Sequence, residues 1–141
     1  MARLELYSRR DGIVQEQSGL NWGFSYGHVC IDDACVAITH YFIRHNKDFF
    51  PPAGSTINVI WDDGTEMECS VEGTQIIDGI KYPKQLTSAR DKSIFGVYMR
   101  RRIGVPSGQR VVMGDLDAYG RRDIEIKMQG PNKYRIDFSV I

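Results

Sequence analysis

Apolar and polar residues alternate along two stretches of the chain, and each stretch predicts a β-hairpin. Residues 55–73, STINVIWDDGTEMECSVEG, alternate on both sides of an Asp63-Gly64 pair. An Asp-Gly pair between two alternating runs is a strong short-range signal for a hairpin turn. Residues 123–141, DIEIKMQGPNKYRIDFSVI, alternate again around a Gly-Pro-Asn turn. The pattern therefore predicts four strands in two hairpins.

Shorter apolar runs predict the remaining strands. Residues 37–50, AITHYFIRHNKDFF, predict a strand followed by a short helix, which the two prolines at 51 and 52 end. Residues 74–86, TQIIDGIKYPKQL, predict a strand that runs into a basic loop. Residues 107–113, SGQRVVM, predict a further strand.

A second helix is predicted at residues 93–105, SIFGVYMRRRIGV, where Gly104 ends the helix and Pro106 prevents its continuation. The apolar residues that share one face of this helix are Ile94, Val97, Tyr98 and Ile103. Residues 114–121, GDLDAYGR, predict a turn-rich link with a short helical turn. Seven short strands and two short helices result. They indicate a mainly β (α+β) domain with barrel-like pairing of Greek-key or meander type.

Length and composition limit the class of protein. A chain of 141 residues with 42% apolar and 26% charged residues is typical of one globular domain, here residues 1–141. No apolar run approaches the roughly 20 residues that span a bilayer, and the N-terminus lacks the apolar core of a signal peptide. Three cysteines, an odd number, argue against a disulfide framework and indicate a reducing cytoplasm. We expect a cytoplasmic protein with no membrane partner.

The charge of the chain is balanced overall but uneven along the sequence. Lysine and arginine number 18, and aspartate and glutamate also number 18. Residues 81–110 hold eight basic side chains against one acidic side chain, and residues 62–78 hold an acidic counterweight. Segregated charge of this kind produces a local potential that the net charge hides. We expect the three arginines at 100–102 to occupy a solvated helix face, with phosphate contact as the alternative.

One acidic pattern resembles the core of a metal-dependent nuclease. Glu125 and Lys127 stand on a predicted strand downstream of Asp117. In such enzymes the carboxylates bind a divalent cation and the lysine polarises the attacking water. The same residues fit a half-exposed strand, whose polar and apolar side chains alternate between two faces. The candidate zinc ligands have a spacing that matches no common structural site: His28, Cys30, Cys35 and His40. The sequence offers no convincing catalytic or metal centre.

Two segments carry side chains that suit contact with nucleic acid. Residues 18–33, SGLNWGFSYGHVCIDD, combine glycines, aromatic residues and short polar side chains in a run unsuited to a helix. Residues 81–93, KYPKQLTSARDKS, mix lysines with short polar residues and an Arg-Asp pair. Lysine and arginine neutralise phosphates, whereas Asn, Gln, Ser and His reach base edges. Two such arms on a barrel would straddle a duplex and enter its major groove.

Several blocks of the sequence resemble a known family. The blocks SGLNWG, DFFPPAG, DDGTEMEC, IFGVYMRRRIGVPSGQRV, GDLDAYGRRDIEIK and YRIDFSV are similar to the B3-like DNA-recognition domain of restriction endonucleases. The resemblance runs from about Leu6 to Val140. It points to the C-terminal domains of phospholipase-D-type restriction enzymes, and more distantly to the EcoRII effector domain and to plant B3 domains.

The resemblance implies a seven-stranded open β-pseudobarrel whose two arms, at about residues 18–33 and 79–93, clamp double-stranded DNA in the major groove and read a short specific site. It implies no catalytic residue in this domain and no cofactor for DNA binding. The nuclease then lies in another domain of the same chain or of a partner chain, in a prokaryotic cytoplasm. The first arm departs from close relatives, which often carry more basic residues there, so no base preference is carried over.

The candidate DNA contacts follow from the chemistry of the two arms. We expect contacts to phosphates or guanines from Lys81, Lys84, Arg90 and Lys92. We expect base-edge contacts from Asn21, Ser25, Tyr26, His28, Gln85, Ser88 and Asp91. Arg44 and Lys47 are candidates for contact with the DNA backbone, and Trp22 either joins the interface or caps the core.

Two functions of other classes stay open at this point. One is a small Mg²⁺-dependent nuclease that uses Asp117, Glu125 and Lys127. The other is a β-barrel protein-interaction module in which the aromatic first arm forms the binding hot spot.

Overall fold

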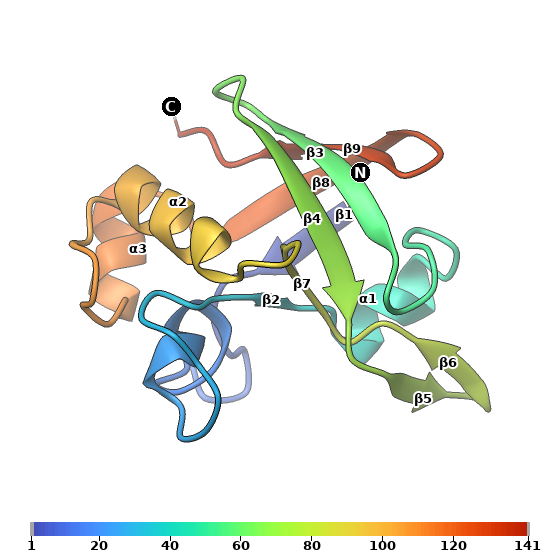
Figure 1. Ribbon diagram of the computed structural model, residues 1–141, viewed down its shortest axis with the longest axis horizontal. Helices are drawn as coiled ribbons and strands as arrows, with labels where there is room; N and C mark the ends of the chain where they lie inside the picture. The colour runs from blue at the N-terminus through green and yellow to red at the C-terminus, as the bar shows by residue number, and fades with distance from the viewer. Residues whose placement is uncertain (1, 141) are drawn as a thin grey trace.

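Seven strands form one mixed sheet that curls into a nearly closed barrel in the computed structural model, which describes residues 2–140 (Figure 1). The strands are β1 (Ala2–Glu5), β2 (Val36–Ala37), β3 (Thr56–Trp61), β4 (Glu66–Glu72), β7 (Gln85–Ser88), β8 (Asp123–Gly130) and β9 (Lys133–Asp137). Their order is β1-β8-β9-β3-β4-β7-β2, in which β3 and β9 are parallel and the other neighbours antiparallel. The edge strands β1 and β2 contact each other and nearly close the sheet. The predicted seven-stranded, mainly β pseudobarrel is confirmed.

Both hairpins that the alternation predicts are present. β3 pairs with β4, and β8 pairs with β9 with an irregularity between Met128 and Gly130. The register of the first hairpin places four buried side chains opposite one another in two cross-strand pairs, Ile57 with Cys69 and Val59 with Met67. Since alternate side chains of a strand face opposite sides of the sheet, this register sends the apolar half of each strand into the core.

The strand and short helix predicted for residues 37–50 are also present, as β2 and α1 (His40–His45). Thr39 caps α1, because its hydroxyl accepts the backbone N–H of Phe42 at 3.1 Å. A 3-10 helix, η1 (Gly19–Phe24), lies in the glycine-rich segment before β2.

The chain before β8 differs from the prediction. Residues 107–112 form no strand, and the predicted turn-rich link is a complete helix, α3 (Met113–Tyr119). The backbone N–H of Val112 donates to the Asp115 carboxylate at 2.9 Å, and Gly120 ends α3 at a φ of 107°. The short apolar run of residues 111–113 misled the prediction, because periodicity cannot distinguish a strand from a helix start over three residues.

Helix α2 (Ser93–Ile103) has the predicted start and stop, and its buried face matches the predicted apolar face only in part. Tyr98 is buried together with Phe95 and Met99, whereas Ile94 and Val97 are 50% and 48% exposed. The inner face also contains Gly96. A search for periodic apolar side chains does not count a glycine as a core residue. A glycine is required there because a Cβ atom would stand 1.6 Å from the Asp32 carbonyl oxygen.

The arginines of α2 also depart from the expected solvated face. Arg100 is buried, and Arg102 pairs with Asp62 at 2.8 Å while it donates to the hydroxyl of Tyr98 at 2.6 Å. Only Arg101 of the three is exposed. Ion pairs and hydrogen bonds therefore hold α2 against the barrel in addition to apolar contacts.

A separate two-stranded sheet interrupts the predicted strand and basic loop. β5 (Gln75–Ile77) and β6 (Ile80–Tyr82) pair antiparallel around a turn of two residues, Asp78 and Gly79. Both turn residues have positive φ, 53° and 78°, which is the backbone that a tight two-residue hairpin turn requires. This hairpin projects from the barrel at the lower right of Figure 1.

The close approach of α2 to the segment around Asp32 gives a stability prediction. Gly96→Ala should lower the free energy of unfolding by about 3 kcal/mol, because either the helix or the segment must move to admit a Cβ atom. Urea unfolding followed by circular dichroism measures this change. Gly114→Ala is the matched control, since no atom lies within 4 Å of its Cβ position in α3 and its φ is helical. Equal stability of the two variants would contradict the assigned packing.

Candidate nucleic-acid interface

Two segments project from the same end of the barrel and flank β2 and β7 (Figure 1). The first arm, residues 18–33, contains η1 and the loop that follows it, at the lower left of the view. The second arm, residues 75–82, is the β5–β6 hairpin. The predicted second arm, residues 79–93, is not one structural unit, because it begins at the hairpin turn and continues through β7 to the start of α2.

A buried ion pair holds the first arm against the barrel. Oδ1 of Asp32 lies 3.3 Å from Nε of Arg100, and the two side chains are only 3% and 2% exposed. The Asp32 carboxylate also accepts the backbone N–H of Gly108 at 2.8 Å and the hydroxyl of Ser107. Arg100 in turn donates to the carbonyl of Gln109 at 3.0 Å. Burial lowers the pKa of Arg100, and the charge of Asp32 opposes that shift.

Asn21, a predicted base reader, lies inside this support. Its side chain is buried, and its amide donates to the carbonyls of Gln15 and Val111 at 2.8 Å each. Its Oδ1 accepts the backbone N–H of Val111 at 2.8 Å and a guanidinium N–H of Arg100 at 3.3 Å. All the hydrogen-bonding capacity of the Asn21 side chain is therefore used within the domain.

The exposed part of the first arm is its outer loop. Tyr26 is 93% exposed, His28 is exposed, and Ser25 is half-buried. Trp22 is half-buried at the base of the arm, with Nζ of Lys92 5.6 Å from the centre of its ring. The structure thus brings Trp22 and Lys92 together, and it presents the other three side chains to solvent.

Two more predicted base readers, Ser88 and Asp91, are committed to the turn before α2. The Ser88 hydroxyl is buried, donates to the carbonyl of Asp91 at 2.5 Å and accepts the N–H of Phe95 at 2.9 Å. The Asp91 carboxylate accepts both the backbone N–H and the hydroxyl of Ser93, at 3.0 and 2.6 Å. These hydrogen bonds lower the pKa of Asp91. Gln85, at the start of β7, is half-buried.

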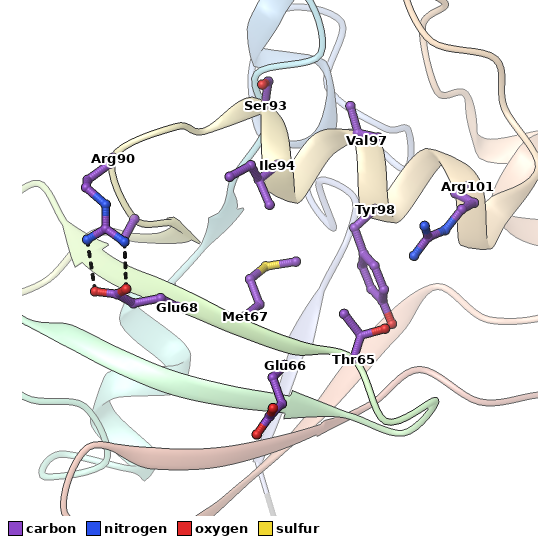
Figure 2. A pocket seen from close by; sticks show the side chains of 11 residues that line it. Thr65, Glu66, Met67, Glu68, Arg90, Ser93, Ile94, Val97, Tyr98 and Arg101 are labelled. Atoms are coloured by element: carbon purple, nitrogen blue, oxygen red, sulfur yellow. Dashed lines mark hydrogen bonds and ion pairs between the residues drawn. The ribbon is translucent and has the colours of Figure 1, made fainter.

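Arg90 lies in a groove between β4 and α2 and not on either arm. Its guanidinium donates to both carboxylate oxygens of Glu68, at 3.0 and 2.6 Å, which raises the pKa of Arg90 and lowers that of Glu68 (Figure 2). The groove has a volume of about 470 Å³, and Met67 and Val97 contribute to its apolar lining.

The expected positive potential of residues 81–110 is reduced by pairing. Lys92 pairs with Glu72 at 3.6 Å, and Arg90, Arg100 and Arg102 pair as described above. Half of the eight basic side chains in this segment are therefore neutralised locally. Within residues 2–140, the basic candidates with no carboxylate oxygen within 4.0 Å are Arg44, Lys47, Lys81 and Lys84.

The two carboxylates of the nuclease alternative form ion pairs with arginines. Glu125 on β8 lies 3.0 Å from Arg3 and 3.2 Å from Arg121, and Asp117 on α3 pairs with Arg122 at 2.6 Å. The part of the chain that the structure describes contains no group of three or more His, Cys, Asp or Glu side chains placed to hold a metal ion.

The cysteines, two of which are candidate zinc ligands, differ in exposure. Cys30 is exposed, whereas Cys35 is buried, and burial raises the pKa of the Cys35 thiol to about 11. Cys69 in β4 is buried as well, and burial raises its pKa to about 12.

Sequence reasoning missed three side chains of the second arm, namely Ile76, Asp78 and Ile80. Ile76 and Ile80 are large apolar residues that remain exposed, and Asp78 occupies the turn. The Asp78-Gly79 pair between apolar residues is the same signal that predicts the turn at residues 63 and 64, and it could have located this hairpin.

Comparison with known protein families gives a match to this chain. The family model described as the NgoFVII C-terminal B3-like DNA-binding domain matches residues 2–129. A search of curated proteins gives no match to the chain. None of the helices found among residues 2–140 has the length and apolarity that crossing a bilayer requires.

The buried ion pair gives a second stability prediction. Arg100→Met should lower the free energy of unfolding by about 3–5 kcal/mol, because it leaves the buried Asp32 carboxylate without its counter-charge. Arg101→Met is the matched control and should change stability by less than about 0.5 kcal/mol, since Arg101 is exposed. Chemical unfolding measures both values. A similar small effect for the two neighbours would contradict the assigned role of Arg100.

The cysteines give a third prediction, on reactivity. At pH 8 an alkylating reagent should label one cysteine per folded chain, Cys30, because only the thiolate reacts and both other thiols are buried with raised pKa values. Mass spectrometry should find three labels after unfolding and none in folded Cys30→Ser. Rapid labelling of a second site in the folded protein would show that the arm or the barrel opens.

Proposed function

The chain belongs to the family of the NgoFVII C-terminal B3-like DNA-binding domain, and from this membership we propose that it reads a short specific sequence in double-stranded DNA through two arms in the major groove. The family is that of a DNA-binding domain of a restriction enzyme. We propose that the domain directs a nuclease domain, in the same or a partner chain of a prokaryotic cell, and that it contributes no catalytic group itself.

The observation that carries the proposal is the placement of the two arms. They project from one end of the barrel and leave β2 and β7 between them (Figure 1). A two-stranded ribbon fits the major groove, which is about 12 Å wide and displays a distinct pattern of donors and acceptors for each base pair. A duplex seated between the arms would therefore present base edges to both.

For the first arm, we propose base contacts from the exposed outer loop. Tyr26 and His28 are exposed and Ser25 borders them, so their polar atoms can reach base edges without a rearrangement of the domain. Trp22 supports the base of the arm. We assign Asn21 to the internal support, because reading a base would break its four buried hydrogen bonds.

For the second arm, we propose that the exposed lysines that lack a carboxylate partner contact phosphates. Lys81 lies on β6, and Lys84 stands between the hairpin and β7, two residues after Tyr82. Gln85 is the adjacent candidate for a base edge. Arg44, in α1, and Lys47, after it, are exposed as well, and we propose that they contact the DNA backbone.

We place Arg90, Ser88 and Asp91 outside the contact set. Each is engaged by neighbours within the domain, and Arg90 would have to exchange a two-bond contact with Glu68 for one with DNA. Such an exchange gains little, because one charge-assisted contact replaces another.

Selection from a pool of random duplexes, at physiological salt and without Mg²⁺, tests the proposal. We expect enrichment of one short motif. Binding without enrichment would leave an electrostatic clamp with no sequence preference. Absence of binding would contradict the function and direct attention to a protein partner for the aromatic arm.

Lys84 gives a fourth prediction. Lys84→Ala should weaken binding to the selected motif and to random duplexes by the same factor, and it should reduce the slope of log K against log salt by about one, because one phosphate contact is lost. Fluorescence anisotropy over a salt series measures both effects. Lys127→Ala, an exposed lysine on β8, is the control and should leave the slope unchanged. A loss confined to the selected motif would reassign Lys84 to base recognition.

A further inference from the structure

The second arm has one face bound to the barrel and one face open to solvent. On the inner face, Nε2 of Gln75 donates to the carbonyls of Ile38 and Pro83 at 2.6 and 2.8 Å, and Ile77 is buried. Because side chains alternate along a strand, the residues between these anchors face away from the barrel.

The open face presents an apolar side chain beside a cation. Ile76 and Lys81 are directly opposite each other across the hairpin, which places both on the outer face. Ile76 is 63% exposed, and Lys81 is exposed. Ile80 is directly opposite Ile77 and therefore belongs to the inner face, so Ile76 is the isoleucine that the open face presents. The core does not need Ile76, because the inner face of the hairpin supplies Ile77 to it.

Among base edges in the major groove, one feature is apolar. Every other position there is a hydrogen-bond donor or acceptor, whereas thymine carries the C5-methyl group. An exposed branched aliphatic side chain matches this methyl group, and a lysine on the same face matches the phosphates that flank the groove. The cation beside the isoleucine favours a nucleic-acid partner over an apolar protein surface.

We propose that Ile76 recognises the C5-methyl group of a thymine in the DNA site. This inference rests on the proposed function, and it adds the base and the atom that the second arm reads. Ile76 would thus be a specificity-determining residue whose contribution is apolar, on an arm whose other contacts are electrostatic.

The test compares thymine with uracil, which lacks only the methyl group and keeps every hydrogen-bonding atom. In the motif that the random pool yields, each thymine is replaced by uracil in turn, and the dissociation constant is measured by anisotropy. We expect a loss of about fourfold at one position, the value for removing one buried methyl group. Ile76→Ala should bind the thymine site about as weakly as the wild type binds the uracil site, and it should no longer distinguish the two.

Ile94→Ala is the matched control, because Ile94 is an isoleucine of comparable exposure on α2. This variant should retain the full uracil effect. A motif without thymine on either strand, a motif in which no uracil weakens binding, or an undiminished uracil effect in Ile76→Ala would overturn the inference while leaving the proposed function standing. A pool that yields no motif would remove both.

Discussion

The buried ion pair between Asp32 and Arg100 is the interaction on which the position of the first arm depends. A glycine-rich segment has little packing of its own and a high conformational entropy to lose on ordering. Here the carboxylate at the end of the arm is fixed by a guanidinium of α2 and by the loop that follows α2. Gly96 lets the helix approach closely enough for this contact. The arm is thus held in place by the helix before any ligand binds, which reduces the ordering cost of binding.

The sheet order explains why so little of the basic segment is free. β4 lies next to β7, so the acidic residues of β4 stand beside the basic residues that follow β7 in the chain. Glu68 and Glu72 take Arg90 and Lys92 as partners, and Asp62 at the end of β3 takes Arg102. Charge that is segregated along the sequence is therefore mixed in space. Among the candidate DNA contacts, the cations without a carboxylate partner lie on or beside the second arm and in or after α1.

The sequence was sufficient for features that depend on local pattern, and insufficient for those that depend on tertiary contacts. Alternation and an Asp-Gly turn predicted the β3–β4 hairpin correctly, and the glycine and proline after α2 located its end. The buried face of α2 could be predicted only in part, because it includes a glycine and an arginine whose burial follows from Asp32, 64 residues away from Gly96. Asn21 has the chemistry of a base reader, and only its buried hydrogen bonds show that it supports the arm instead. The strand pattern indicated barrel-like pairing, and the resemblance to B3-like domains narrowed it to a seven-stranded open pseudobarrel, but neither gave the strand order.

The same polar residue types thus serve two purposes that only burial separates. Asn21, Ser88 and Asp32 lie inside and hydrogen-bond to the backbone, so replacing them should lower the stability of the fold. Tyr26, His28, Lys81 and Lys84 lie outside, where a substitution usually changes stability by less than about 0.5 kcal/mol. Under the proposed function, an exchange of exposed arm residues changes the DNA site while the buried support keeps the arms in place. The nearly neutral first arm and the apolar side chain on the outer face of the second arm fit this separation, because neither feature disturbs the network beneath it.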